Sequence, residues 1–67
     1  MSSPILRYFA VDHLPAHLHA TAAPFRELAH QLDDRLPHGA EKSVALRKLL
    51  ESKDAAVRAA LDLPTEG

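Results

Sequence analysis

Cysteine is absent from this sequence of 67 residues, glycine and aromatic residues are scarce, and no long apolar run occurs. Without cysteine the chain forms no disulfide, no zinc–thiolate site and no thiol nucleophile. Because no apolar run approaches the roughly 20 residues that cross a bilayer, we expect no membrane partner. The first residues lack a basic stretch followed by a long apolar one, so we expect no secretory signal and an intracellular location.

A surplus of positive charge is also missing. Eight lysines and arginines stand against nine aspartates and glutamates, and the formal net charge is -1. Proteins that are held to nucleic acid mainly by charge need a surplus of basic residues to displace counterions. The composition therefore predicts no DNA or RNA partner.

The chain is small for an independent domain. A domain of this size buries only about 60% of the surface of its unfolded chain and is marginally stable alone. Since disulfides and metal–thiolate sites are excluded, oligomerisation is the remaining way to stabilise the fold. Hydrophobic residues make up 46% of the chain, which is ample for burial against a partner. We therefore expect a homo-oligomer.

Apolar residues recur with helical spacing in a first stretch from Leu14 to Leu36, in which Pro15 can occupy the first helical turn. Spacings of three, four and seven place them on one stripe of a helix. Because the apolar phase continues across Pro24, we expect this proline to bend the helix rather than to end it. The stripe consists of Leu14, Leu18, Phe25, Leu28, Leu32 and Leu36.

A second helix is predicted from about Ala40 to Leu61, after a turn at residues 37–39. The segment is rich in good helix formers, and Glu41 complements the positive end of the helix dipole. Its apolar residues cover two neighbouring stripes, wide enough to touch one helix of the same chain and another helix of a second chain. They are Ala45, Leu46, Leu49, Leu50, Ala56, Val57, Ala60 and Leu61.

Matched helix lengths and a short connection predict an all-α fold, a two-helix antiparallel hairpin. Residues 1–13 would form an irregular or extended N-terminal arm, since the β-favouring cluster at residues 8–11 is too short for a sheet. The hairpin domain would span residues 14–63, and residues 64–67 would form a tail. The open side of such a hairpin again indicates a homo-oligomer.

Catalytic and metal-binding patterns are weak. The five histidines include His13 and His17 at a zinc-like spacing, but Pro15 lies between them and no third ligand follows at a regular distance, so no metal site is expected. Asp33 and Asp34 are adjacent and point about 100° apart on a helix, which is typical of a solvated face rather than an acid/base pair. We therefore predict that the protein is not an enzyme.

Cations and aromatic residues are more informative. Lys53 lies close to the apolar stripe of the second helix, so it must pair, extend to solvent or meet a ligand anion; a salt bridge to a carboxylate of the facing helix is favoured. Tyr8 and Phe9 are adjacent on the arm. They can stack on a nucleobase or plug the open side of the hairpin, and burial is the commoner fate of such rings.

Five segments occur in a familiar order: Arg7-Tyr8-Phe9, Asp12-His13-Leu14-Pro15, Pro24–Ala29, Leu36–Leu46 and Leu49–Ala60. Over residues 7–62 the chain resembles a family of small phage proteins, common in viruses of actinobacteria. These proteins contain the helical-hairpin domain shared by anti-CBASS and Thoeris anti-defence nucleotide sponges.

The resemblance implies both a fold and an activity. Members form hairpins that assemble into trimers and hexamers. They bind cyclic oligonucleotides or cyclic ADP-ribose isomers made by bacterial immune enzymes and sequester these signals without cleaving them. It further implies that the protein acts in immune evasion, in the cytoplasm of the infected bacterial host, and needs no cofactor.

In the arm, the resemblance implies that Tyr8 or Phe9 stacks on a base of the ligand, with His13 in the same ligand-binding motif. Val11 stands where many relatives look aromatic, and both Tyr8 and Phe9 remain candidates for stacking.

In the helices, the resemblance implies that Arg26 reaches a phosphate. Lys42, Ser43 and Arg47 lie at the start of the second helix, where phosphate oxygens can also meet backbone N–H groups. A few cations suffice for a small anion, and symmetry in an oligomer would repeat each of them.

Two other functions stay open. The wide apolar surface of the second helix would equally suit a small helical oligomer that docks on a host or phage protein. A hydrolase of nucleotide signals that uses histidines, with His13 as its best candidate, has the least support.

Overall fold

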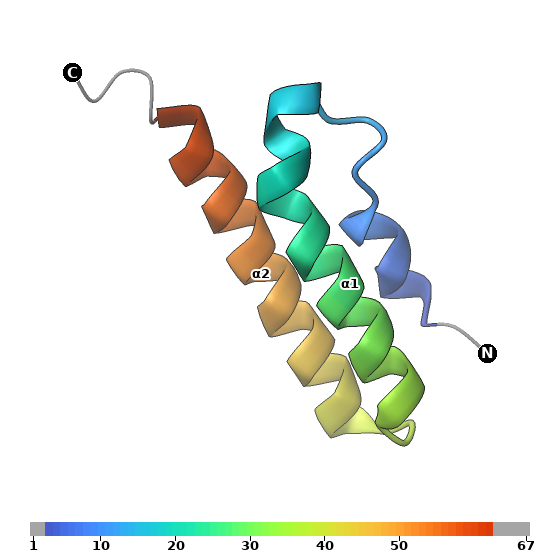
Figure 1. Cartoon of the computed structure of the whole chain (residues 1–67). Coiled ribbons are helices and arrows are strands. Elements are labelled where there is room, and N and C mark those ends of the chain that lie inside the picture. The colour runs from blue at the N-terminus through green and yellow to red at the C-terminus, as the bar shows by residue number, and fades with distance from the viewer. Residues whose placement is uncertain (1–2, 63–67) are drawn as a thin grey trace.

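The computed structural model describes residues 3–62, and all of the regular structure in this range is helical. The helix α1 (His19–Arg35) and the helix α2 (Ala40–Asp62) lie side by side and run in opposite directions (Figure 1). Two short 3-10 helices precede them, η1 (Pro4–Phe9) and η2 (Ala16–Leu18). This confirms the predicted all-α fold with two long helices packed together. The predicted tail lies outside the described residues.

The first long helix begins later than predicted. After Pro15 the chain forms the 3-10 turn η2, and α1 starts only at His19. Pro24 then lies inside α1, which continues to Arg35, so the prediction of one helix passing through this proline is confirmed. Leu36 N–H donates to Leu32 O at 2.9 Å and closes the last turn.

The connection between the long helices is short. Residues 36–39 reverse the chain, and α2 begins at Ala40 with Ser43 N–H donating to Gly39 O at 3.2 Å. Glu41 lies in the first turn of α2, where its carboxylate complements the positive end of the helix dipole.

Residues 4–9 of the N-terminal arm form the 3-10 helix η1, which corrects the prediction of an irregular or extended segment for this part, whereas residues 10–13 form no helix. Pro4 is the first residue of η1, a position where its missing N–H costs no hydrogen bond. A 3-10 helix has three residues per turn, so Leu6 and Phe9 lie on one face. Both are buried, with 7% and 0% of their surface exposed. The β-favouring residues of the arm are thus accommodated by packing rather than by strand pairing.

η1 contacts both long helices, and its buried face completes the core between them. Leu6 and Phe9 form a buried cluster with Ala29 of α1 and Leu46 of α2. Partly buried residues surround this cluster: Ile5, Phe25, Leu32, Leu49 and Leu50. η1 therefore covers a side of the hairpin that the sequence left open, and the plugging interpretation of Phe9 is confirmed.

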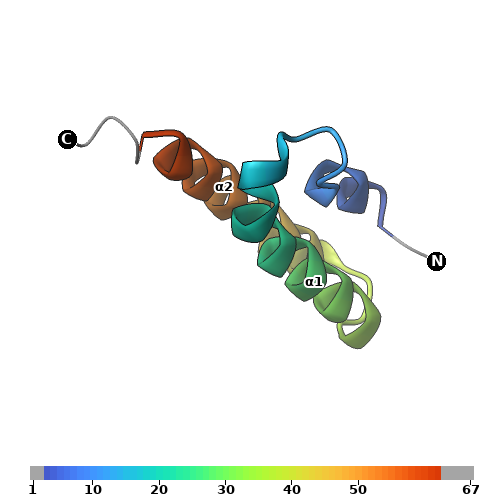
Figure 2. The same cartoon turned by 45° about the horizontal axis from the view of Figure 1, so that its top comes forward.

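The loop from η1 to η2 runs at the end of the hairpin opposite the connection between α1 and α2 (Figure 2). Val11 and Leu18 are buried at this end. A ring nitrogen of His19, Nε2, lies 2.9 Å from Leu14 O. The start of η1, in contrast, lies near the α1–α2 connection, and this places it beside the first turns of α2.

Candidate functional site

A cleft of about 360 Å³ lies where the start of η1 meets the start of α2. This volume is within the range of small-molecule sites, near its lower end. One wall comes from Ser3 and the first residues of η1, and the other from α2 and the preceding turn. The lining residues are Ser3, Pro4, Ile5, His38, Ser43, Leu46 and Arg47.

The α2 wall of the cleft carries hydrogen-bond donors. Ser43 and Arg47 are four residues apart, so they lie on the same face of α2, and both are exposed. Arg47 takes part in none of the ion pairs found within residues 3–62. His38 adds an imidazole from the turn. A guanidinium, a hydroxyl and an imidazole beside the positive end of a helix form an environment suited to an anion.

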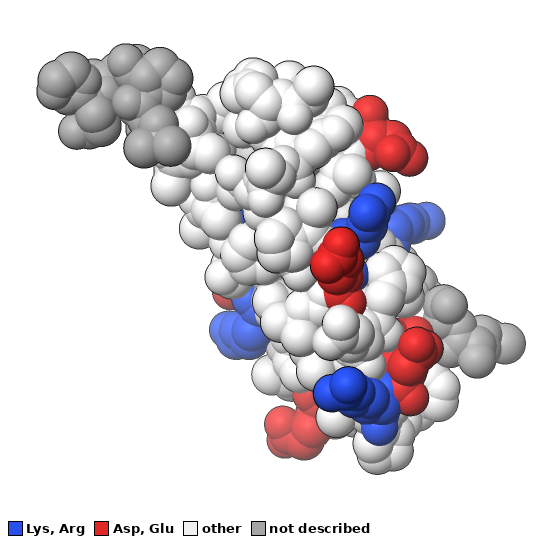
Figure 3. All heavy atoms as spheres, in the orientation of Figure 1, with Lys and Arg blue, Asp and Glu red and all other residues white. Residues whose placement is uncertain are grey.

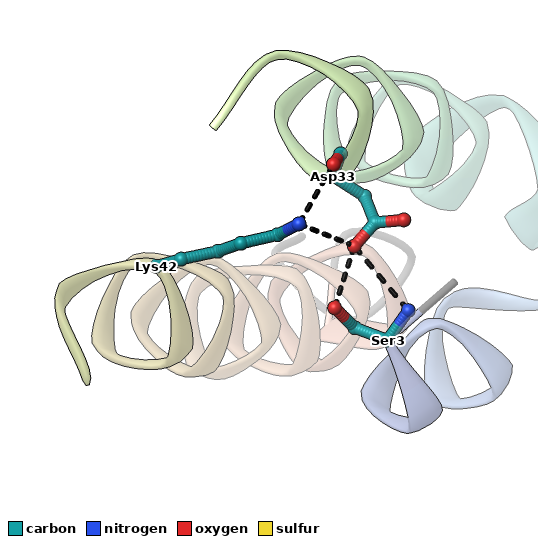
Figure 4. A network of polar contacts seen from close by, with 3 residues as sticks. All are labelled: Ser3, Asp33 and Lys42. Atoms are coloured by element: carbon teal, nitrogen blue, oxygen red, sulfur yellow. Dashed lines mark hydrogen bonds and ion pairs between the residues drawn. The ribbon is translucent and has the colours of Figure 1, made fainter. Parts of the chain in front are cut away.

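A buried polar network lies next to this cleft (Figure 4). Lys42 Nζ of α2 donates to Asp33 O at 2.7 Å and lies 3.1 Å from Asp33 Oδ1 of α1. The same oxygen, Asp33 Oδ1, accepts hydrogen bonds from Ser3 Oγ at 2.5 Å and from Ser3 N–H at 3.3 Å. The side chains of Lys42 and Asp33 are only 5% and 6% exposed. The network thus joins α1, α2 and the residue before η1.

The hydrogen bond from Ser3 Oγ holds the pKa of Asp33 below its ordinary value. The hydrogen bond and the charge of Lys42 lower this pKa further, and burial opposes them. The carboxylate is therefore ionised in the folded chain at neutral pH, and its negative charge is matched by Lys42.

This lowered pKa predicts a loss of stability in acid. Because the native pKa lies below the unfolded value of about 3.9, Asp33 stabilises the fold above that pH. The contribution is lost as the pH falls through this value towards the native pKa. We expect Asp33→Asn to remove this part of the acid dependence of the urea midpoint, and Asp34→Asn, at an exposed neighbour, to retain it. An equal acid dependence in the wild-type and Asp33→Asn proteins would contradict this assignment.

Lys53 is the second buried lysine of α2. Its Nζ donates to Tyr8 O at 2.9 Å and lies 3.3 Å from Asp54 Oδ1. The expected salt bridge to a carboxylate of the facing helix is therefore wrong: the carboxylate belongs to the next residue of α2. The physical reason is that the end of η1 presents carbonyl oxygens without helical partners, and these attract a cation.

The two aromatic candidates of the arm have different environments. Phe9 is fully buried, so its ring has no face free for a base, and its assignment as a ligand-binding residue is corrected. Tyr8 is 52% exposed. The Arg7 guanidinium lies 5.0 Å from the centre of the Tyr8 ring, and Arg7 Nη2 donates to Tyr8 Oη at 3.0 Å.

The remaining predicted residues do not all meet at one place. Ser43 and Arg47 line the cleft, whereas Lys42 beside them is buried and bonded to Asp33, which corrects its assignment to a ligand. Arg26 is partly buried on α1 and does not line the cleft. His13 is exposed in the loop between η1 and η2, at the opposite end of the hairpin (Figure 1).

Sequence reasoning missed Ser3, Asp33 and His38. Asp33 was interpreted as part of a solvated face, yet it is buried. One signal was present: Ala22, Ala29 and Asp33 are spaced by seven and four residues, so they share one helix face, and all three are buried. Nothing local identifies Ser3 as its partner, because 30 residues separate the two.

Comparison of the chain with protein-family models, with curated proteins and with solved structures finds no match. Within residues 3–62, no three histidine, aspartate or glutamate side chains come together in a way that could hold a metal ion. None of the helices in this range is both long and apolar enough to span a bilayer.

Proposed function

We propose that the protein binds a small cyclic nucleotide signal, a cyclic oligonucleotide or a cyclic ADP-ribose isomer, and sequesters it without cleaving it. In this proposal it is a phage immune-evasion protein that acts in the cytoplasm of the infected bacterial host, as the family resemblance implies. The observation that carries the proposal is the cleft of about 360 Å³ that contains Ser43 and Arg47. Both residues belong to the predicted ligand-binding set and lie near the start of α2, where phosphate oxygens can also meet backbone N–H groups.

The polar side of the cleft suits a phosphate group. Arg47 supplies a charged donor, Ser43 a hydroxyl and His38 an imidazole. Because α2 begins beside them, its first backbone N–H groups lack acceptors within the helix and add positive potential. Hydrogen bonds to charged groups contribute about 1.5–3 kcal/mol each. One phosphate is therefore the best-matched ligand group.

The apolar side of the cleft suits a sugar or a base. Pro4 and Ile5 provide apolar surface on the wall opposite the donors of α2, and Leu46 adds an apolar lining residue on the α2 wall. The three-residue period of η1 places Tyr8 on the same side as Ile5, roughly 6 Å further along the helix. A half-exposed tyrosine at that position is a stacking surface, and stacking on a base contributes about 1–3 kcal/mol. Tyr8 is therefore our candidate for the base contact.

Assembly into a homo-oligomer, a trimer or a hexamer, is part of the proposal. Its support is the small size of the chain, which is marginal as an isolated domain. An extended uncharged area on the face shown in Figure 3 is also suited to burial against another copy. In such an assembly each cleft would be repeated by symmetry.

Titration calorimetry of the purified protein with cyclic dinucleotides, cyclic trinucleotides and cyclic ADP-ribose isomers tests the proposal. We expect at least one of them to bind, and we expect Arg47→Gln to weaken that binding by roughly tenfold or more, since a charged hydrogen bond is lost. Light scattering of the same sample should show a mass above that of one chain.

The matched control is Arg58→Gln, which removes the same charge about 16 Å further along α2 and should leave the affinity unchanged. Absence of heat with every ligand, or equal affinity of Arg47→Gln and the wild type, would contradict the proposal. Ligand released by protease digestion of the complex should have its original mass, whereas a cleaved product would indicate an enzyme.

A second candidate is a small helical module that docks on a host or phage protein. The observation that favours it is the exposure of large apolar side chains on the two long helices: Leu28 is 43% exposed, Val44 45% and Leu61 51%. A module of this kind would retain its activity in Arg47→Gln, and the nucleotide-binding protein would not.

A further inference from the structure

We propose that Ser3 and Asp33 are positioning residues of the cleft: they hold the start of η1 in place as one of its walls. Docking of this wall and binding of an anion in the cleft then stabilise each other. This inference rests on the proposed function, because it concerns the same cleft. It goes beyond that function in assigning a role to two residues that need not touch the ligand with their polar atoms.

The cleft exists only while the start of η1 is docked. Ser3, Pro4 and Ile5 form one of its walls, and Ser43 and Arg47 belong to the other. The two walls are separated by about 40 residues of sequence, so no local structure holds them together. A ligand that contacts both walls binds only the docked form.

The two ends of η1 are held by different forces. At its start, Ser3 donates two hydrogen bonds to the Asp33 carboxylate (Figure 4). Lys42 Nζ lies 3.1 Å from the same carboxylate oxygen and donates to the Asp33 backbone carbonyl at 2.7 Å. At its end, the Phe9 side chain is fully buried and Lys53 donates to the Tyr8 carbonyl. Ser3 therefore depends on a few polar bonds, whereas Leu6 and Phe9 hold the rest of η1 by apolar packing. Loss of the Ser3 bonds frees Ser3, and with it the acceptor of the Leu6 N–H, while the rest of η1 stays in place.

Asp33 does not line the cleft and acts through Ser3. If only a fraction of the molecules has the wall docked, the apparent affinity is reduced by that fraction. By thermodynamic linkage, an anion that bridges the walls must also stabilise the docked form. The affinity for the anion and the stability of the docked wall therefore report on the same docking equilibrium.

Amide hydrogen exchange followed by NMR tests this inference, since each end of η1 has its own reporter. Leu6 N–H donates to Ser3 O at 3.1 Å in the first turn, and Ala10 N–H donates to Arg7 O at 3.3 Å after the last. We expect Ser3→Ala to accelerate the exchange of Leu6 by roughly tenfold, because a hydrogen bond to a charged group is lost, and to leave Ala10 nearly unchanged. Ser52→Ala, at an exposed serine of α2, is the matched control.

A second experiment of the same kind adds inorganic pyrophosphate as the anion. We expect pyrophosphate to slow the hydrogen exchange of the Leu6 amide in the wild type. We also expect Ser3→Ala to bind pyrophosphate more weakly, by the factor by which the docked fraction of molecules is reduced. Unchanged Leu6 exchange in Ser3→Ala, or acceleration that is equal at Leu6, Ala10 and core amides, would overturn the positioning role. No effect of pyrophosphate on Leu6 in the wild type would overturn the coupling. The proposed function fails separately, when no cyclic nucleotide gives heat.

Discussion

Phe9→Ala should remove most of the stability of the fold. The ring is fully buried and packs with Leu6, Ala29 and Leu46, so that its loss opens a cavity between three helical segments. Substitutions of this kind cost about 3–5 kcal/mol. At about 0.05–0.15 kcal/mol per residue, a chain of this length has only about 3–10 kcal/mol in total. Thermal unfolding followed by circular dichroism should show a strongly lowered midpoint or no folded baseline.

Tyr8→Ala is the matched control, because it truncates the adjacent aromatic residue. Tyr8 is 52% exposed, and its contact with Arg7 lies at the surface. Its truncation should cost less than about 1 kcal/mol. Similar midpoints for Phe9→Ala and the wild type would show that η1 is not part of the cooperative fold.

Lys42→Met should produce the second large loss. The variant keeps a long apolar side chain but leaves the buried Asp33 carboxylate without its cation. Uncompensated buried charges are strongly destabilising. Lys48→Met is the control, since the Lys48–Glu51 pair is 70% and 61% exposed and such pairs contribute about 0–1 kcal/mol. Urea unfolding should show a loss for Lys42→Met that is several times larger.

The double variant Lys42→Met with Asp33→Asn distinguishes the effect of the ion pair on stability from the effect of the surrounding packing. Because no buried charge remains, we expect it to be more stable than Lys42→Met alone. A double variant whose loss equals the sum of the two single losses would show that the residues do not interact. Equal losses for Lys42→Met and Lys48→Met would show that the buried pair does not matter for stability.

The long helices could be predicted because their signals are local and repeated. The spacing of Leu28 and Leu32, and the good helix formers after Ala40, depend only on residues a few positions apart. The 3-10 helix η1 could not be predicted in this way. Its apolar residues repeat once only, at Leu6 and Phe9, and burial against two other helices is what makes the short helix stable.

The candidate site was accessible to sequence reasoning only on the α2 side. Ser43 and Arg47 are four residues apart on one helix, so they share a face in any fold that keeps the helix. The opposite wall, from Ser3 to Ile5, depends on where η1 docks. The burial of a lysine also depends on how the other helices pack, so it could not be predicted from the sequence. Lys42 is buried and Lys48 is exposed, although both lie in the first half of α2.

Composition and periodicity alone were thus enough to establish the all-α class, the extent of the second helix and the place of the turn. Packing added what no local pattern contains: the burial of Phe9, the matching of Lys42 with Asp33, and the cleft between η1 and α2. Helical hydrogen bonds join residues four positions apart, and therefore leave a trace in the sequence. The Ser3–Asp33 contact joins residues 30 positions apart, and arises only when the helices assemble.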